Sequence, residues 1–120
     1  MRSVNYKGKC IKKKLKKSRD ISKFYDNIQL AFAERMDSDP DIKEITVNFY
    51  LQDFCEGEFT TDIVCVKADG SYMVRECLFR KKLLLPRTCR LLDASHLYWL
   101  KRGVEDWGLV IEQEVFANAE

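Results

Sequence analysis

Residues 59–82 read FTTDIVCVKADGSYMVRECLFRKK. The two ends of this stretch, residues 59–67 and 71–80, are rich in Val, Ile, Thr, Tyr and Phe, which are the residue types that strands favour. Between them lies Asp69-Gly70, a dipeptide typical of a tight β-turn. The stretch therefore predicts a hairpin of two antiparallel, neighbouring strands.

Two acids in this hairpin are candidate metal ligands. Asp62 opens the first strand, and Glu76 shares one face of the second with two apolar residues and Arg80, because side chains alternate along a strand. Burying such a carboxylate alone costs several kcal/mol, so it must be paired, exposed or metal-bound. Two interpretations stay open: the acids share a divalent metal, or they are edge-exposed or paired with Arg75 or Arg80.

The flanking segments complete an α/β pattern. An amphipathic helix capped by Asp20 or Ser22 ends near Met36, and a half-buried strand covers 42–51. After the hairpin, Pro86 starts a second helix that stops at Gly103, and a buried strand follows at 107–111. The last strand is expected to be parallel to a neighbour because a helix precedes it. The predicted order is α-β-β-β-α-β in a mixed sheet.

Charge is distributed unevenly along the chain. Residues 1–19 hold nine Lys or Arg and no acid, while the remaining residues hold twelve basic and nineteen acidic side chains. This predicts a basic arm at 1–19 in front of a domain at 20–120, and nucleic acid is the commonest partner of such an arm. A nucleus-type address and a solvated tail remain alternatives. The candidate contacts to a DNA backbone are Lys12, Lys13, Lys14, Lys16, Lys17 and Arg19.

Several classes of protein are disfavoured by the composition. No apolar run approaches the roughly 18 residues that span a bilayer, and the first residues lack a secretory apolar core, so a location inside the cell is expected. Five cysteines without a C-x-x-C pair indicate reduced thiols. The single histidine, His96, lacks partners for nucleophilic catalysis, and Trp99 and Trp107 are interpreted as core residues.

Three stretches resemble the catalytic domain of TnsA, the endonuclease subunit of heteromeric bacterial transposases. They are DNIQLAFAE with IKEITVNFYLQ (26–34 and 42–52), TTDIVCVKADG (60–70), and RTCRLLDASHLYWLKRGVEDWGLVIE (87–112). The likeness runs from residue 22 to residue 112. The predicted order of elements is also the common core of restriction-endonuclease-like PD-(D/E)XK nucleases, so the resemblance implies that fold.

The resemblance implies a catalytic site. It places the family's metal-binding aspartate at Asp62 and its second strand ligand at Glu76, with Mg²⁺ or Mn²⁺ as the metal. The family's helix carboxylate falls on Gln29, which is neutral and at most a weak ligand through its carbonyl oxygen, and the family's lysine falls on Leu78. Two positions therefore depart from the family pattern.

Replacements for these two positions are expected nearby. Asp26 lies one turn before Gln29 on roughly the same side of the helix, whereas Glu34 lies beyond it on a different side. Asp26 is therefore the better stand-in for the family's helix acid. Arg80, on the same strand face, is the first candidate for the missing cation, and Lys81 and Lys82 are alternatives if the strand bulges.

The resemblance also implies a function. It is that of a Mg²⁺-dependent DNA endonuclease subunit in the bacterial cytosol, cutting double-stranded DNA at transposon ends beside a TnsB-like DDE transposase. A TnsC-like ATPase regulator is a further possible partner, and no membrane contact is expected. Two alternatives remain: a nuclease-deficient subunit that binds DNA and transposase, and a stand-alone nuclease of restriction or repair type.

Overall fold

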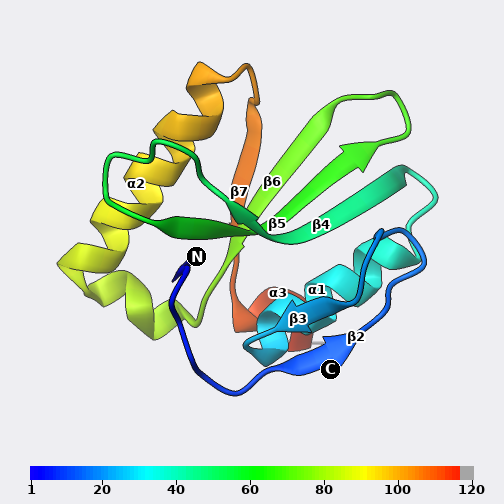
Figure 1. Cartoon of the computed structure of the whole chain (residues 1–120), viewed down its shortest axis with the longest axis horizontal. Helices are drawn as coiled ribbons and strands as arrows, with labels where there is room; N and C mark the ends of the chain where they lie inside the picture. Colours follow the sequence, from blue (N-terminus) through cyan, green and yellow to red (C-terminus); the bar gives the residue numbers. More distant parts are fainter. Residues whose placement is uncertain (117–120) are drawn as a thin grey trace.

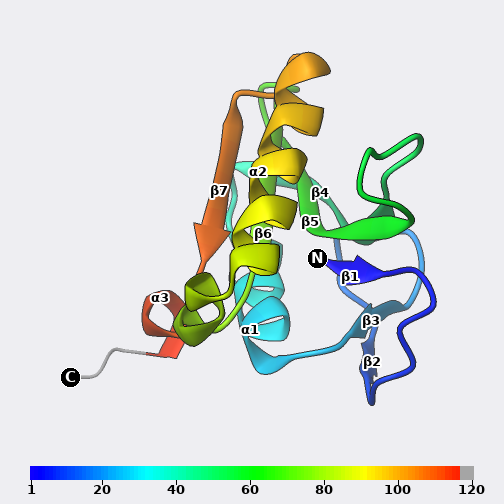
Figure 2. The ribbon, with the colours of Figure 1, turned by 90° about the vertical axis from the view of Figure 1, so that its left-hand side faces the viewer.

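A mixed five-stranded sheet with helices on both faces forms the body of the protein (Figures 1 and 2). The computed structural model describes residues 1–116, so the last four residues of the predicted domain 20–120 lie outside the described part. The helices are α1 (Asn27–Asp37), a 3-10 turn η1 (Arg80–Leu84), α2 (Pro86–Lys101) and α3 (Glu112–Phe116). The strands are β1 (Arg2–Ser3), β2 (Ile11–Lys13), β3 (Ser22–Phe24), β4 (Ile42–Tyr50), β5 (Phe59–Lys67), β6 (Tyr72–Cys77) and β7 (Asp106–Val110). The expected mixed α/β architecture is confirmed.

The predicted hairpin forms the centre of the sheet. β5 pairs antiparallel with β4 on one side and with β6 on the other, and β7 pairs parallel with β6. Gly70 lies in the connecting turn with φ of 88°, a backbone angle that glycine adopts at little cost. The antiparallel hairpin and the parallel last strand are therefore confirmed.

Alternating side chains of the hairpin feed two separate cores. Ile63 and Cys65 pack on the α1 face, whereas Val64 and Val74 pack against Tyr98 and Trp99 of α2. The two helices therefore cover opposite faces of the sheet, as the period of two along a strand requires. Helix α2 therefore covers the side chains of β5 and β6 that point to its face of the sheet.

The first nineteen residues are folded onto the body. β1 pairs with β5, and β2 pairs with β3 in a small second sheet (Figure 2). Leu15 is 1% exposed and belongs to the core on the α1 face. A basic stretch with a buried leucine and two paired strands presents its charges from fixed positions.

The first helix begins later than the sequence suggested. Ser22 and Phe24 are buried while Lys23 is exposed, a strand pattern that places Phe24 in the core. Asp26 has an extended backbone and caps α1, accepting a hydrogen bond from the Gln29 N–H. The expected cap at Asp20 or Ser22 is therefore wrong.

The third predicted strand is shorter than expected, whereas the second helix is as expected. β6 ends at Cys77, and η1 follows directly. The expectation that Arg80 lies on the same strand face as Glu76 is therefore wrong. α2 starts at Pro86 and stops before Gly103, whose φ is 83°. None of the helices in residues 1–116 is long and apolar enough to cross a membrane.

Candidate metal centre at the end of the hairpin ladder

Asp62 and Glu76 meet where β5 and β6 separate. The last paired residues are Ile63 and Arg75. Beyond them the Asp62 N–H donates to Glu76 Oε1 at 2.9 Å, and the Cys77 N–H donates to Asp62 Oδ2 at 2.8 Å. The two carboxylates thus accept backbone N–H groups that the strand ladder has released, and this fixes both side chains at the fork.

Two hydroxyl groups hold the other oxygen of Glu76. Thr61 Oγ1 lies 3.0 Å and Ser95 Oγ lies 2.7 Å from Glu76 Oε2. Ser95 comes from α2, so the helix that covers this face of the sheet also contacts the carboxylate. Thr61, Glu76 and Ser95 are each 0% exposed.

Two indoles set the direction of these hydroxyl hydrogen bonds. Trp99 Nε1 donates to Thr61 Oγ1 at 2.9 Å, and Trp107 Nε1 donates to Ser95 Oγ at 3.1 Å. An indole N–H can only donate, so each hydroxyl accepts from its indole and turns its own hydrogen toward Glu76. Glu76 therefore receives only donors.

The charge on Glu76 is set by opposing influences. Burial is the largest cause and raises the pKa of Glu76, and the neighbouring Asp62 acts in the same direction. The Met1 ammonium group and the Ser95 hydroxyl bond lower it. With every hydrogen-bond partner a donor, the arrangement fits the carboxylate form and needs a cation beside it.

The carboxylates converge on one cationic atom. The Met1 ammonium nitrogen lies 2.7 Å from Asp62 Oδ2 and 3.4 Å from Glu76 Oε1. Burial lowers the pKa of this amine, but the charges of Asp62 and Glu76 outweigh burial and raise the pKa to about 10. The position between these two oxygens therefore favours positive charge.

A second observation at the same place fits a metal. Asp62 Oδ1 is buried and has no hydrogen-bond partner among the described residues. Carboxylate oxygens are the ligands that Mg²⁺ prefers, and Mg²⁺ commonly takes one or two carboxylates with water and substrate phosphate in its remaining positions. Residues 1–116 contain no group of three or more His, Cys, Asp or Glu placed to hold a metal ion. Asp62 and Glu76 are therefore two carboxylate donors without a third such side chain beside them in the described part of the chain.

The side chain of Gln29 contacts the backbone carbonyl group of Asp62. Gln29 Nε2 donates to the Asp62 carbonyl oxygen and to Asn48 Oδ1, both at 3.0 Å, and Gln29 Oε1 accepts from the Tyr25 N–H at 3.1 Å. Its carbonyl oxygen, the atom that was expected to act as a weak ligand, is therefore engaged with the backbone. Asn48 adopts a φ of 54° within β4, which asparagine tolerates better than most residues.

Asp26, the proposed stand-in acid, is also engaged. Its Oδ1 accepts from the Gln29 N–H at 2.7 Å, and its Oδ2 forms an ion pair with Arg2. No hydrogen bond or ion pair links Asp26 to Asp62 or Glu76 in the described part of the chain. It caps the helix that carries Gln29, and through Gln29 it supports the backbone of Asp62.

A hollow of about 370 Å³ lies beside the centre. Its walls include Met1, Cys77, Leu78 and Lys82. Arg80 does not line it, and the Arg80 N–H donates to Glu112 Oε1 at 2.7 Å. Among the cations expected near Glu76, the structure places Lys82 at the hollow.

The six predicted DNA contacts fall into two groups. Lys13 is ion-paired with Glu34, Lys14 Nζ donates to the Leu15 and Ser18 carbonyls, and Lys17 Nζ donates to the Met36 and Asp39 carbonyls. The side chains of Lys12, Lys16 and Arg19 have no such partner within residues 1–116. Structural contacts therefore occupy half of the predicted set.

The residues that hold Glu76 were not identified from the sequence. Trp99 and Trp107 were interpreted as core residues, and Thr61 and Ser95 were not singled out. One signal was available, because Ser95 lies between Leu92 and Trp99 on the apolar stripe of α2. A buried hydroxyl on such a stripe must find a hydrogen-bond partner, and here the partner is Glu76.

A comparison of the chain with protein-family models and with curated proteins finds no significant match.

Proposed function

We propose that this protein is a Mg²⁺- or Mn²⁺-dependent DNA endonuclease of the restriction-endonuclease-like class, similar to the TnsA subunit of bacterial transposases. The observation that carries the proposal is the convergence of Asp62 Oδ2 and Glu76 Oε1 on one cationic atom, with Asp62 Oδ1 left without a partner. The order α1, β4, β5, β6, α2, β7 supports it, since it is the order of that nuclease core.

The residues of the centre have separate tasks in this proposal. A divalent metal held by Asp62 and Glu76 would supply a polarised water and offset the charge that develops on the scissile phosphate. Thr61 and Ser95 keep Glu76 in place as an acceptor, and Gln29 keeps the backbone of Asp62 in place. Lys82 is the cation that we assign to the leaving or attacking oxygen, in place of the family lysine.

By the resemblance, the substrate is duplex DNA at the end of a mobile element. The protein would cut the strand that a TnsB-like DDE transposase leaves intact, with a TnsC-like ATPase as regulator. The place of action would be the bacterial cytosol.

A second function is a nuclease-deficient subunit of the same complex. The observation that favours it is Leu78 at the position of the family lysine, together with a Gln29 whose carbonyl oxygen is bonded to the Tyr25 N–H. Such a subunit would bind DNA and transposase without cutting. A stand-alone restriction or repair nuclease would cut without the transposase.

Nicking of transposon-end DNA by Asp62→Asn and by the wild type distinguishes these functions. With Mg²⁺ or Mn²⁺ and the cognate transposase, we expect Asp62→Asn to lose nicking by about a thousandfold or more. Circular dichroism and thermal unfolding check that the variant is folded. Wild-type nicking by Asp62→Asn would refute the catalytic assignment. Absence of nicking by the wild type would favour the deficient subunit, and nicking without the transposase would favour the stand-alone enzyme.

A further inference from the structure

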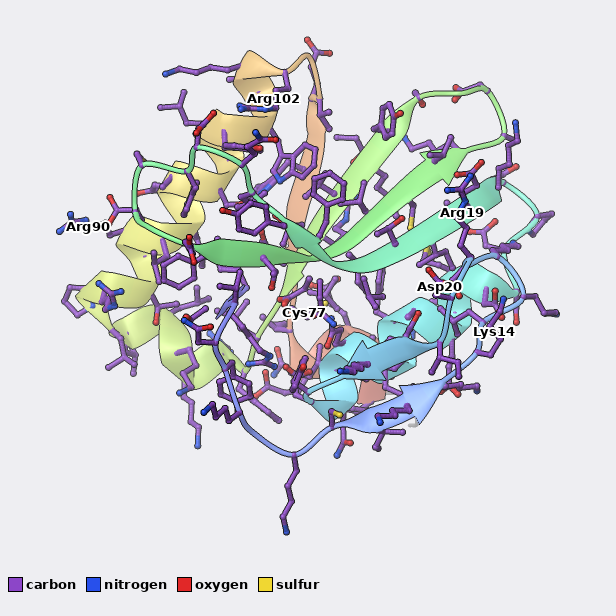
Figure 3. The ribbon with its side chains drawn as sticks, in the orientation of Figure 1. Lys14, Arg19, Asp20, Cys77, Arg90 and Arg102 are labelled. Carbon is purple, nitrogen blue, oxygen red and sulfur yellow. The ribbon has the colours of Figure 1, made fainter. Side chains whose placement is uncertain are left out.

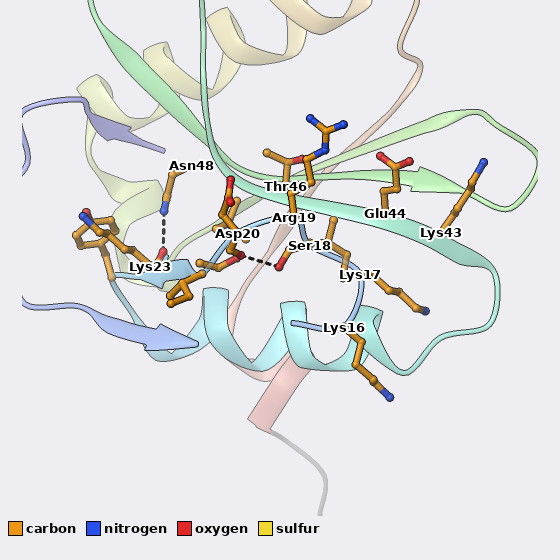
Figure 4. A pocket seen from close by; sticks show the side chains of 15 residues that line it. Lys16, Lys17, Ser18, Arg19, Asp20, Lys23, Lys43, Glu44, Thr46 and Asn48 are labelled. Atoms are coloured by element: carbon orange, nitrogen blue, oxygen red, sulfur yellow. Dashed lines mark hydrogen bonds between the residues drawn. The ribbon is translucent and has the colours of Figure 1, made fainter. Parts of the chain in front are cut away.

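A hollow of about 720 Å³ runs between the segment 16–23 and the exposed face of β4 (Figure 4). The cations along it come from segments that are distant in sequence. Two acids, Asp20 and Glu44, also line it, so its lining carries an excess of positive charge. We call this hollow the basic groove, and its cations are Lys16, Lys17, Arg19, Lys23 and Lys43.

None of the five cations has a carboxylate partner within residues 1–116, and the side chains of four of them have no hydrogen-bond partner there either. Lys17 is held by two backbone carbonyls, but Lys16, Arg19, Lys23 and Lys43 form no ion pair within residues 1–116. Lys16, Arg19, Lys23 and Lys43 are also exposed. Fixed cations that are gathered around a hollow and not neutralised by the protein attract a polyanion.

The backbone under the groove is held in place. Asn48 Nδ2 donates to the Lys23 carbonyl at 2.6 Å, and the Ile45 N–H donates to the Lys17 carbonyl at 3.0 Å. The two walls are thus bonded to each other at their bases, so the backbone of the segment that carries Arg19 and Lys23 is held beside β4, which carries Lys43. In Figure 3, Arg19 lies beside β4, whereas Cys77 lies near the middle of the molecule.

The groove leads toward the carboxylate centre. Tyr25 lines both the basic groove and the smaller hollow beside Met1 and Cys77. Asn48, at the end of the groove, also bonds Gln29, which in turn bonds the carbonyl of Asp62. Tyr25 is thus shared by the two hollows, and Asn48 and Gln29 connect the wall of the groove with the backbone of Asp62.

The chemistry of the lining favours the phosphate backbone of a duplex. A single strand is held by successive bases stacked on aromatic rings, and among the described residues only Tyr25 is an aromatic residue that lines the groove. Lys and Arg around a hollow contact phosphates whatever the base sequence. Phosphates of one strand of double-stranded DNA match these cations.

We propose that the basic groove, through Arg19, Lys23 and Lys43, binds the backbone of duplex DNA that extends from the cleavage site. This inference rests on the proposed function only for the direction in which the DNA leaves the centre. Of the six predicted DNA contacts, Lys16, Lys17 and Arg19 line this surface, and Lys12, Lys13 and Lys14 do not. The surface adds Lys23 of β3 and Lys43 of β4, which the sequence did not single out.

The test is the salt dependence of DNA binding. A fluorescently labelled duplex of random sequence is titrated with protein in EDTA at several salt concentrations, so that no cleavage takes place. Log affinity falls linearly with log salt, and each lost phosphate contact reduces the magnitude of this slope by about 0.9. We expect the triple variant Arg19→Ala, Lys23→Ala, Lys43→Ala to lower the slope by roughly 2 to 3.

A matched control comes from the same basic stretch. The triple variant Lys7→Ala, Lys9→Ala, Lys12→Ala removes the same charge from exposed side chains that do not line the groove. We expect its slope to change by less than about 1. An equal loss of slope in both triple variants would overturn the groove proposal, because net charge alone would then account for binding.

Three further measurements keep the test decisive. Lys43→Glu alone, a change on an exposed side chain, should lower the slope even if the triple variant is poorly folded. Stronger binding of single-stranded DNA or of RNA with the same loss of slope would overturn the duplex assignment. Duplex binding in EDTA and nicking with Mg²⁺ or Mn²⁺ are measured on the same wild-type protein, so that failure of the nuclease proposal and failure of the groove are seen separately.

Discussion

The carboxylate centre and the basic groove are built in opposite ways. At the centre, Glu76 is fully buried, and its contacts come from backbone, hydroxyl and ammonium donors. Two indoles hold the hydroxyl donors in turn. In the groove, Arg19, Lys23 and Lys43 are exposed and unpaired within residues 1–116. The centre is expected to respond to mutation as one coupled unit, and the groove as a sum of independent charges.

The thiols give the largest expected contrast between buried and exposed positions. Burial raises the pKa of Cys65 to about 12, and it raises the pKa of Cys77, which lies beside Asp62, well above the usual value. Reaction of a thiol requires the thiolate and access. We expect Cys10, Cys55 and Cys89 to react quickly with a disulfide reagent at neutral pH, and Cys65 and Cys77 at least about a thousandfold more slowly. Fast labelling of all five would mean that the hairpin core opens readily.

Removal of the central acceptor is expected to have the largest effect on stability. Glu76→Ala leaves the Thr61 and Ser95 hydroxyls and the Asp62 N–H without their acceptor, and we expect the free energy of unfolding to fall by about 3 kcal/mol. Urea denaturation measures this. Lys43→Ala in the groove is the control and should change stability by less than about 0.5 kcal/mol. Equal losses of stability in Glu76→Ala and Lys43→Ala would mean that the two regions do not differ in this respect.

A double-mutant cycle tests coupling within the centre. Trp99→Phe keeps a ring in the core but removes the N–H that orients Thr61, and Thr61→Val removes the hydroxyl. Because both changes break one chain of hydrogen bonds, we expect their effects on unfolding to differ from additivity by about 1 kcal/mol. The matched pair Arg19→Ala and Lys43→Ala should be additive within about 0.5 kcal/mol. Additivity in both cycles would mean that the indole does not act through the hydroxyl.

The smallest effect is expected at an exposed ion pair. Lys13 pairs with Glu34, and the two side chains are 45% and 44% exposed. Water and salt screen such a pair, so Lys13→Ala should lower stability by no more than about 0.5 kcal/mol. Its slope of DNA affinity against salt should remain near the wild-type value. A loss of slope as large as that of Lys43→Glu would return the DNA contact to the lysines at 12–14.

The hairpin was predictable because its signals are local. Asp69-Gly70 and the strand-forming residues around it specify the turn and the pairing without information from the rest of the chain. The start of α2 at Pro86 and its stop before Gly103 were predictable for the same reason. The hairpin by itself already brings Asp62 close to Glu76.

The remaining parts depended on contacts between distant segments. Ile21 and Phe24 fit the periodicity of a helix, but pairing with β2 makes Ser22–Phe24 a strand. Residues 1–19 were predicted as an arm from their charge, and only the packing of Leu15 and the pairing of β1 with β5 show how they are held. The roles of Trp99 and Trp107 arise from hydroxyls on other elements, which no local pattern reveals.

The Asp69-Gly70 turn also has a consequence for the order of folding. Asp62 and Glu76 are separated by fourteen residues, so the hairpin can bring the two acids together early, while water still solvates both charges. Ser95 and the two indoles arrive only when α2 and β7 dock, and β1 must return over almost sixty residues to reach β5. We therefore expect tryptophan fluorescence to report the last step of folding, in which two hydrated carboxylates lose their water.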